Sequence, residues 1–167
     1  SAGALLDRLD PVIADRAGDL LDVGVGTGNL ALPALRRWPR VQVTGIDASR
    51  EMVTAVEQIA DRELAHQRHR FRSTVAYAAD LPFDDGVFDV AMSSFVLQLV
   101  PSRAKALREI RRVLRPHGIL AYVTWLQDRT PFAPDRVFDG LLAEFGFDEE
   151  SSDARSGDLP SVDRAAA

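Results

Sequence analysis

Residues 20–30 form the most informative stretch of the chain, Leu20-Leu21-Asp22-Val23-Gly24-Val25-Gly26-Thr27-Gly28-Asn29-Leu30. Its apolar beginning predicts a buried strand, and its end predicts the start of a helix. The three glycines between them predict a tight turn, because glycine adopts backbone angles that other residues avoid. Such a turn leaves main-chain N–H groups at a helix N-terminus open to a negatively charged or hydrogen-bonding ligand. A purely structural turn is the alternative interpretation.

The rest of the chain alternates short apolar runs with helical stretches, which is typical of a parallel sheet flanked by helices. We expect strands at residues 19–23, 41–46, 73–78, 87–93 and 118–125, and helices at residues 29–37, 49–64 and 102–115. The predicted fold class is α/β, a doubly wound and mostly parallel sheet with helices on both faces. Residues 79–86 are shorter than a usual parallel crossover, so either a strand boundary is misplaced or this connection has no helix.

Composition limits the classes of protein that the chain can represent. With 167 residues, of which 46% are hydrophobic and 27% charged, the chain fits one domain with a sizeable core. A net charge of −5 without a basic run argues against a nucleic-acid partner. The absence of cysteine excludes disulfides, thiolate metal sites and a thiol nucleophile, and we predict no metal site. No apolar run is long enough to span a bilayer and no signal-peptide pattern is present, so we predict a cytoplasmic location.

An acidic residue ends the second predicted strand, in the segment Gly45-Ile46-Asp47, nineteen positions after Gly28. In a parallel sheet this position lies beside the glycine turn, where a carboxylate can accept hydrogen bonds from both hydroxyls of a ribose. Asp47 could instead cap the following helix, although Ser49 is better placed to do so. The pattern therefore favours a nucleotide-containing cofactor.

Two cofactor classes share these features. The dinucleotide pattern G-x-G-x-x-G/A fits Gly26 to Ala31 only one register late, and it leaves Gly24 unexplained. An oxidoreductase Tyr-x-x-x-Lys pair is also missing, since no lysine stands four residues after Tyr77 or Tyr122. The segment Asp22-Val23-Gly24-Val25-Gly26-Thr27-Gly28 instead resembles the first motif of the class I S-adenosylmethionine-dependent methyltransferases, which is an acidic residue, one spacer and then G-x-G-x-G.

Later segments extend this resemblance over about residues 19–126. Residues 45–52, Gly-Ile-Asp-Ala-Ser-Arg-Glu-Met, are similar to the family's second motif, and residues 77–83, Tyr-Ala-Ala-Asp-Leu-Pro-Phe, are similar to its third. Residues 88–98 and 106–118 resemble the small-molecule branch that includes the ubiquinone and menaquinone C-methyltransferases. The resemblance implies a Rossmann-like domain, S-adenosylmethionine as cofactor with S-adenosylhomocysteine as product, and methyl transfer to a small-molecule acceptor by in-line displacement.

The resemblance also implies which residues bind the cofactor. Asp47 would hold the ribose, while Asp80 would accept a hydrogen bond from the adenine amino group. Asp22 would either only fix the turn or also help to hold the methionine ammonium group. Ala48 and Met52 would pack on adenine. The full set of expected cofactor-binding residues is Asp22, Gly24, Val25, Gly26, Gly28, Asp47, Ala48, Met52, Asp80, Leu81 and Ser93.

No catalytic side chain is predicted. Methyl transfer from an activated donor needs alignment, and a general base is needed only if the acceptor must lose a proton. His66 and His69 are expected at the surface, and His117 is expected in a turn where relatives have glycine. Relatives often have histidine at the position of Gln98. Four aromatic or polar residues near strand ends either line an apolar acceptor pocket or belong to the core: Phe95, Gln98, Trp125 and Phe132.

The family's sheet normally ends with two further strands, and helices that cover the acceptor pocket normally precede the first strand. We find neither pattern and interpret the chain as an incomplete version of the domain. Residues 1–147 are expected to form the cofactor-binding domain, and residues 148–167 a polar flexible tail. A sheet edge left open by missing strands would favour a homodimer. The alternatives to a methyltransferase are an NAD(P)-dependent oxidoreductase and a non-catalytic module that binds the cofactor or a partner protein.

Overall fold

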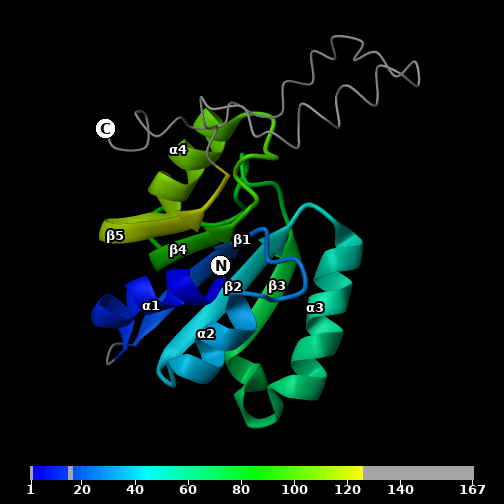
Figure 1. Ribbon diagram of the computed structural model, residues 1–167. Helices are drawn as coiled ribbons and strands as arrows, with labels where there is room; N and C mark the ends of the chain where they lie inside the picture. Colours follow the sequence, from blue (N-terminus) through cyan, green and yellow to red (C-terminus); the bar gives the residue numbers. More distant parts are fainter. Residues whose placement is uncertain (1, 15–16, 126–167) are drawn as a thin grey trace, which may run out of the picture. The chain divides into compact units, whose positions relative to one another are not determined.

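The computed structural model describes residues 2–14 and 17–125 of the chain, which include one five-stranded sheet (Figure 1). All neighbouring strands of this sheet pair in parallel, in the order β3-β2-β1-β4-β5. The strands are β1 Gly18–Val23, β2 Val41–Asp47, β3 Phe71–Val75, β4 Phe88–Ser94 and β5 Leu114–Val123. The doubly wound α/β fold that the sequence predicts is therefore confirmed.

Helices cover both faces of the sheet. Apolar side chains of α1 Ala2–Ile13, α2 Ala31–Arg37 and α3 Arg50–Glu63 pack with one face, while α4 Arg103–Val113 packs on the other. Figure 1 shows α4 beside β4 and β5, apart from the other three helices. Cover on both sides explains why most residues of β1, β2 and β4 are buried. In the part of the chain that the structure describes, no helix is long and apolar enough to cross a membrane.

The expectation that no helix precedes the first strand is wrong, because α1 occupies residues 2–13. Pro11 inside the helix weakens the sequence signal, since proline removes a backbone donor. Tertiary contacts support the helix instead. Asp10 accepts a hydrogen bond from the Trp38 indole Nε1, at 2.8 Å, and pairs with Arg37. Four apolar residues of α1 are buried in the core: Leu5, Leu6, Leu9 and Ile13.

Several element boundaries also differ from the prediction. β3 covers residues 71–75 in place of 73–78, and residues 76–87 connect it to β4 without a helix. The predicted boundary of this strand was therefore misplaced, and the connection also has no helix. Helix α4 ends at Val113, before Pro116, because Leu114 already pairs with Phe88 of β4. The predicted lack of the family's last two strands, the boundary after residue 147 and the flexible tail all concern residues outside the described part of the chain.

The strand order places β1 at the centre, with β2 on one side and β4 on the other. Connections from these strands leave in opposite directions, which opens a crevice at their carboxyl ends. The glycine turn follows β1 at this place, and Asp47 ends β2 beside it. The fold thus brings the two strongest sequence signals to the same edge of the sheet.

Candidate functional site

The glycine turn after β1 is fixed from both neighbouring strands. The N–H groups of Gly24 and Val25 both donate to the Ile46 carbonyl of β2, at 2.8 Å each. On the β4 side, a Cβ atom on Gly24 would lie 2.3 Å from Val96 Cγ2, so no side chain fits there. Gly24, Gly26 and Gly28 all have positive φ, of 77°, 50° and 90°. These angles explain the need for glycine in the turn.

Asp47 joins the glycine turn to the start of α3. Its Oδ2 atom accepts a hydrogen bond from the Gly26 N–H at 2.9 Å, and its Oδ1 atom accepts one from the Ser49 N–H at 3.0 Å. Ser49 is the N-cap of α3, because its hydroxyl accepts the Met52 N–H at 3.2 Å. The carboxylate of Asp47 is half-buried and has lone pairs for further donors. Asp47 is therefore not the helix cap, and it faces the crevice as a hydrogen-bond acceptor.

Asp22 lies beneath the turn and is 1% exposed. Its Oδ2 atom accepts the N–H of Ala31, at 3.1 Å, in the first turn of α2. The N-cap position of α2 is Leu30, whose side chain makes no capping hydrogen bond, so Asp22 does this from β1. Burial raises the pKa of the Asp22 carboxyl to about 7, while the Ala31 N–H lowers it and the charge of Asp47 raises it further. The turn-fixing role of Asp22 is thus visible in the structure.

Two cavities meet at this edge of the sheet. The larger has a volume of about 590 Å³ and lies between the end of β2, residues 76–80 of the crossover and the segment from β4 to α4. The smaller has a volume of about 410 Å³ and lies against the glycine turn. Gly24, Asp47 and Val96 line both cavities. The two spaces therefore flank the Asp47 carboxylate.

Most of the residues predicted to bind a cofactor line these cavities: Asp22, Gly24, Val25, Gly26, Asp47, Ala48, Met52 and Asp80. Three of the predicted residues are placed elsewhere. A Cβ on Gly28 would meet Leu32 and Val56, so this glycine serves the packing of α2 and α3. Leu81 is buried in the core. The Ser93 hydroxyl donates to the Val23 carbonyl at 2.8 Å and ties β4 to β1.

The sequence analysis missed several lining residues, which come from the connection between β4 and α4 and from the first turn of α4. Val96 lines both cavities, and Leu99 and Lys105 line the larger one. Their position after β4 could have indicated that they lie near the glycine turn. That inference needs the strand order, which places β4 beside β1. Phe95, offered as a pocket or core residue, lines the smaller cavity and has a positive φ of 57°. Gln98 instead is buried and accepts the Thr124 hydroxyl at 2.7 Å.

The other candidate residues lie away from the crevice. His66 and His69 are exposed on the 3-10 helix η1 Ala65–Arg70, and His117 is exposed with a positive φ of 64°. The predicted surface position of His66 and His69 is confirmed. The predicted turn at His117 is wrong as stated, because His117 lies within β5, where the pairing with β4 changes register. Trp125 is 63% exposed, and Phe132 lies outside the described residues. Within residues 2–14 and 17–125, no group of three or more acidic or histidine side chains could hold a metal ion.

Comparisons with known proteins match the same part of the chain. Residues 21–122 match the family model described as "Methyltransferase domain". The ubiquinone/menaquinone biosynthesis C-methyltransferase UbiE of Geobacter sp. (strain M21) is 38% identical over 128 residues, which are 75% of this chain and 51% of that protein. The 27-O-demethylrifamycin SV methyltransferase of Amycolatopsis mediterranei (strain S699) is 34% identical over 165 residues, which are 93% of this chain and 59% of that protein.

One similar solved structure is named for a different activity. The crystal structure of the [4+2]-cyclase SpnF has a TM-score of 0.70 and 31% sequence identity, covering 81% of this chain and 49% of that chain. The chain spans about half the length of the curated relatives it matches.

The glycines of the turn allow a matched test of packing against backbone strain. We expect Gly26→Ala to cost about 1–2 kcal/mol from its positive φ alone, because a Cβ there meets nothing within 4 Å. Gly28→Ala should cost about 2–5 kcal/mol, because its Cβ would lie 2.7 Å from Leu32 Cγ. Urea unfolding of the two variants measures both values. Equal losses would contradict this account of the turn.

The raised pKa of Asp22 predicts a pH dependence of stability. Between the unfolded pKa of 3.8 and the folded value of about 7, the native state holds a proton that the unfolded state has released. The free energy of unfolding contributed by Asp22 therefore falls as pH rises from about 4 to about 7, by at most about 1.4 kcal/mol per pH unit. Asp22→Asn removes this titration while keeping an acceptor for Ala31. Relative to the variant, the wild type should be more stable at pH 5 than at pH 8, as measured by urea unfolding, and parallel pH profiles would refute the assignment.

Proposed function

The chain belongs to the methyltransferase-domain family, in the S-adenosylmethionine-dependent group that its motifs predicted, and we propose that it transfers a methyl group from S-adenosylmethionine to a small-molecule acceptor. One observation carries the proposal. Asp47 lines both of two neighbouring cavities, beside a turn that leaves open space at Gly26. This arrangement suits a ligand whose central ribose joins a base on one side to a charged chain on the other.

The larger cavity is proposed to hold the adenosine part of the cofactor. Its walls are mainly apolar, and Ala48 stands next to Asp47 on one of them. Asp80 lines the same space and is the proposed acceptor for the adenine amino group. Asp47, at the junction of the two cavities, is the proposed acceptor for the ribose hydroxyls. A carboxylate suits this role because each oxygen accepts more than one hydrogen bond.

The smaller cavity is proposed to hold the methionine part. Gly26 has space above it, so the cofactor chain can approach the backbone closely. Asp22 borders the same cavity, and its buried carboxyl gains an ionised state only at the cost of desolvation. An ammonium group placed there would stabilise the ionised carboxylate. This supports the second of the two roles that the sequence left open for Asp22, in addition to capping α2.

Catalysis is proposed to rest on alignment. Bound S-adenosylmethionine supplies a methyl group that is already activated on a sulfonium. The residues of the chain then need to orient the donor and exclude water, which can contribute up to about 7–11 kcal/mol for two reactants held in line. Phe95 and Val96 close the smaller cavity on the β4 side. No histidine lines either cavity in the described part of the chain, so these residues offer alignment and no imidazole base.

The acceptor is proposed to be a small apolar or aromatic molecule. Leu30, Met52 and Phe95 give an apolar lining to the smaller cavity, and the acceptor has to approach the methyl group of a cofactor whose methionine part lies there. The relatives named above differ in their printed acceptors, one being a C-methyltransferase of quinone biosynthesis and another a methyltransferase of a demethylrifamycin. A nicotinamide-dependent oxidoreductase is not favoured by any of these relatives. The predicted homodimer and cytoplasmic location stay predictions.

Binding of the product tests the cofactor site directly. In calorimetric titrations of the full chain, S-adenosylhomocysteine should bind and NAD should not. Asp47→Asn should weaken S-adenosylhomocysteine binding by about tenfold or more, because a hydrogen bond to a charged group contributes about 1.5–3 kcal/mol. Asp61→Asn removes a carboxylate from the exposed side of α3 and serves as the matched control. NAD binding, or equal affinities in the two variants, would overturn the proposed site.

Turnover must be measured separately from binding, because one similar structure is named a cyclase. The full chain is incubated with methyl-labelled S-adenosylmethionine and a panel of phenols, hydroquinones and activated aromatic carbon acids. Label should move to at least one acceptor in wild type and be strongly reduced in Asp47→Asn. Tight S-adenosylhomocysteine binding with no transfer to any acceptor would favour the non-catalytic module.

A further inference from the structure

The crossover of residues 76–87 shapes the larger cavity but has no helix of its own. It leaves β3 at one edge of the sheet and reaches β4 on the far side of β1. A segment without regular structure must find partners for its backbone N–H and carbonyl groups elsewhere. Residues 76–80 line the cavity, so whatever holds this segment also sets the position of the cavity wall.

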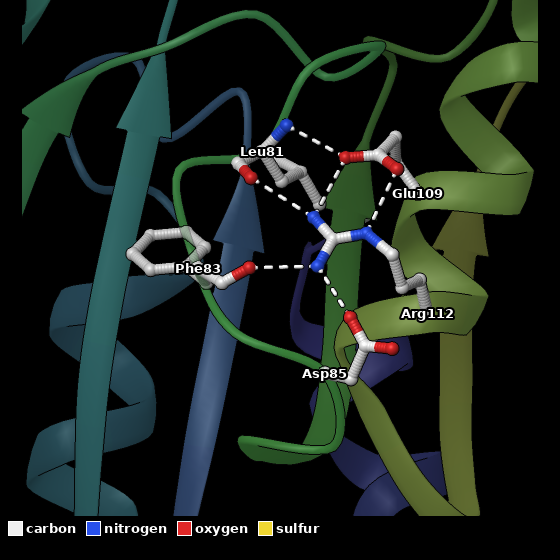
Figure 2. Close-up of polar contacts among 5 residues, drawn as sticks. All are labelled: Leu81, Phe83, Asp85, Glu109 and Arg112. Carbon is white, nitrogen blue, oxygen red and sulfur yellow. Dashed lines mark hydrogen bonds and ion pairs between the residues drawn. The ribbon is translucent and has the colours of Figure 1, made fainter.

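Two charged residues of α4, Glu109 and Arg112, supply those partners, as Figure 2 shows. The Leu81 N–H donates to Glu109 Oε2 at 2.9 Å. Arg112 donates to the Leu81 carbonyl at 3.0 Å, to the Phe83 carbonyl at 2.7 Å and to the Asp85 carboxylate at 2.8 Å. Its Nε and Nη2 atoms also donate to Glu109, at 2.9 and 2.8 Å. We call Glu109 and Arg112 together the α4 clamp.

The α4 clamp acts next to the residue proposed to contact adenine. Leu81 follows Asp80 directly, and its side chain is buried in the core that includes α4. Farther along the segment, the Gly86 N–H donates to the backbone carbonyl of Arg112 at 3.0 Å. At its start, the Ala76 N–H donates to the Asp47 carbonyl at 3.0 Å. The segment that carries Asp80 is therefore hydrogen-bonded to β2 at its start and to α4 farther along.

We infer that Glu109 and Arg112 are positioning residues that hold Asp80 at the edge of the adenine ring, so that recognition of the base depends on α4. The inference rests on the proposed function. It adds residues that do not line either cavity to the determinants of cofactor selectivity.

The small stabilising energy of surface ion pairs supports a positioning role for the α4 clamp. The side chains of Glu109 and Arg112 are 20% and 32% exposed, and partly exposed pairs contribute little to stability. The Arg112 guanidinium and the Leu81 N–H lower the pKa of Glu109 to about 2, so the pair is charged at neutral pH. A planar guanidinium can bridge two carbonyls and a carboxylate at once, whereas a lysine ammonium is a single point charge. The contacts thus define the path of the backbone more than they stabilise the fold.

The test compares two ligands that differ only at the base edge. S-adenosylhomocysteine has a 6-amino group, whereas its purine-riboside analogue has only hydrogen at C6 and keeps N1 as an acceptor, so it has no N–H on this edge to donate to Asp80. Calorimetry on the full chain should show that wild type prefers the adenosyl ligand by about tenfold or more. In Arg112→Met, the dissociation constant of the adenosyl ligand should rise at least about tenfold and the preference should fall toward one. Arg112→Lys should not restore the preference.

Two further variants separate positioning from general stability. Arg68→Met removes a comparable group of contacts, to Glu57, Asp61 and the Phe71 carbonyl, at η1 and away from both cavities. It should lower the melting temperature to a similar degree while keeping the base preference. Asp80→Ala should abolish the preference by itself. The double variant Asp80→Ala with Arg112→Met should bind the adenosyl ligand no more than about twofold more weakly than Asp80→Ala, because both changes remove the same interaction.

The possible results separate this inference from the proposed function. If wild type binds neither ligand, the proposed function fails. If wild type binds both ligands equally, Asp80 does not recognise the base and the inference fails while the cofactor site stands. If Arg112→Met and Arg112→Lys keep the wild-type preference, the α4 clamp is merely structural. Should Arg112→Met not fold, Glu109→Gln and Arg112→Lys decide the question by the same ratio.

Discussion

The contact between Gly24 and Val96 is the constraint on which the site depends. A Cβ atom on Gly24 would overlap the Val96 side chain, so the turn after β1 can lie against the β4 connection only if this residue is glycine. The Ile46 carbonyl holds the same turn from the β2 side through two N–H groups. With both sides of the turn fixed, the Gly26 N–H donates to Asp47. The space where a Gly26 side chain would stand is open. Both cavities border this turn at Gly24.

Two carboxylates at the ends of adjacent strands have different environments in this arrangement. Asp22 is buried beneath the turn, which disfavours its charged form and raises its pKa, while the Ala31 N–H that it caps partly opposes this shift. Asp47 is half-buried and organises the backbone of two loops with its two oxygens. Like charges this close also disfavour joint ionisation, which is part of the shift at Asp22. The pair is therefore suited to a ligand that brings a positive charge to Asp22 and hydroxyl donors to Asp47.

The crossover between β3 and β4 shows how one helix can serve two parts of the fold. Helix α4 packs Ala106, Ile110 and Val113 into the core on one face of the sheet. Its polar side carries Glu109 and Arg112, which satisfy backbone groups that a crossover helix would otherwise satisfy within itself (Figure 2). Ser102, before α4, and Lys105, in its first turn, line the larger cavity. Helix α4 therefore both lines the site and packs on the sheet.

The sequence by itself determined the presence of the five strands, the glycine turn and the acid at the end of β2, because these depend on local period and on backbone angles that only glycine adopts easily. The family followed from the resemblance of its motifs. The sequence also placed Ser49 as the cap of α3, a contact that spans only three residues. It did not reveal α1, whose stability comes from contacts of Asp10 and buried leucines with distant residues rather than from its own propensity. It also could not assign Gly28 and Ser93 to packing and to a strand contact, since Leu32, Val56 and Val23 become their neighbours only in the folded sheet. Only the tertiary structure decided that Val96 and Lys105 line the site and that α4 holds the crossover, because those relations follow from strand order and not from spacing along the chain.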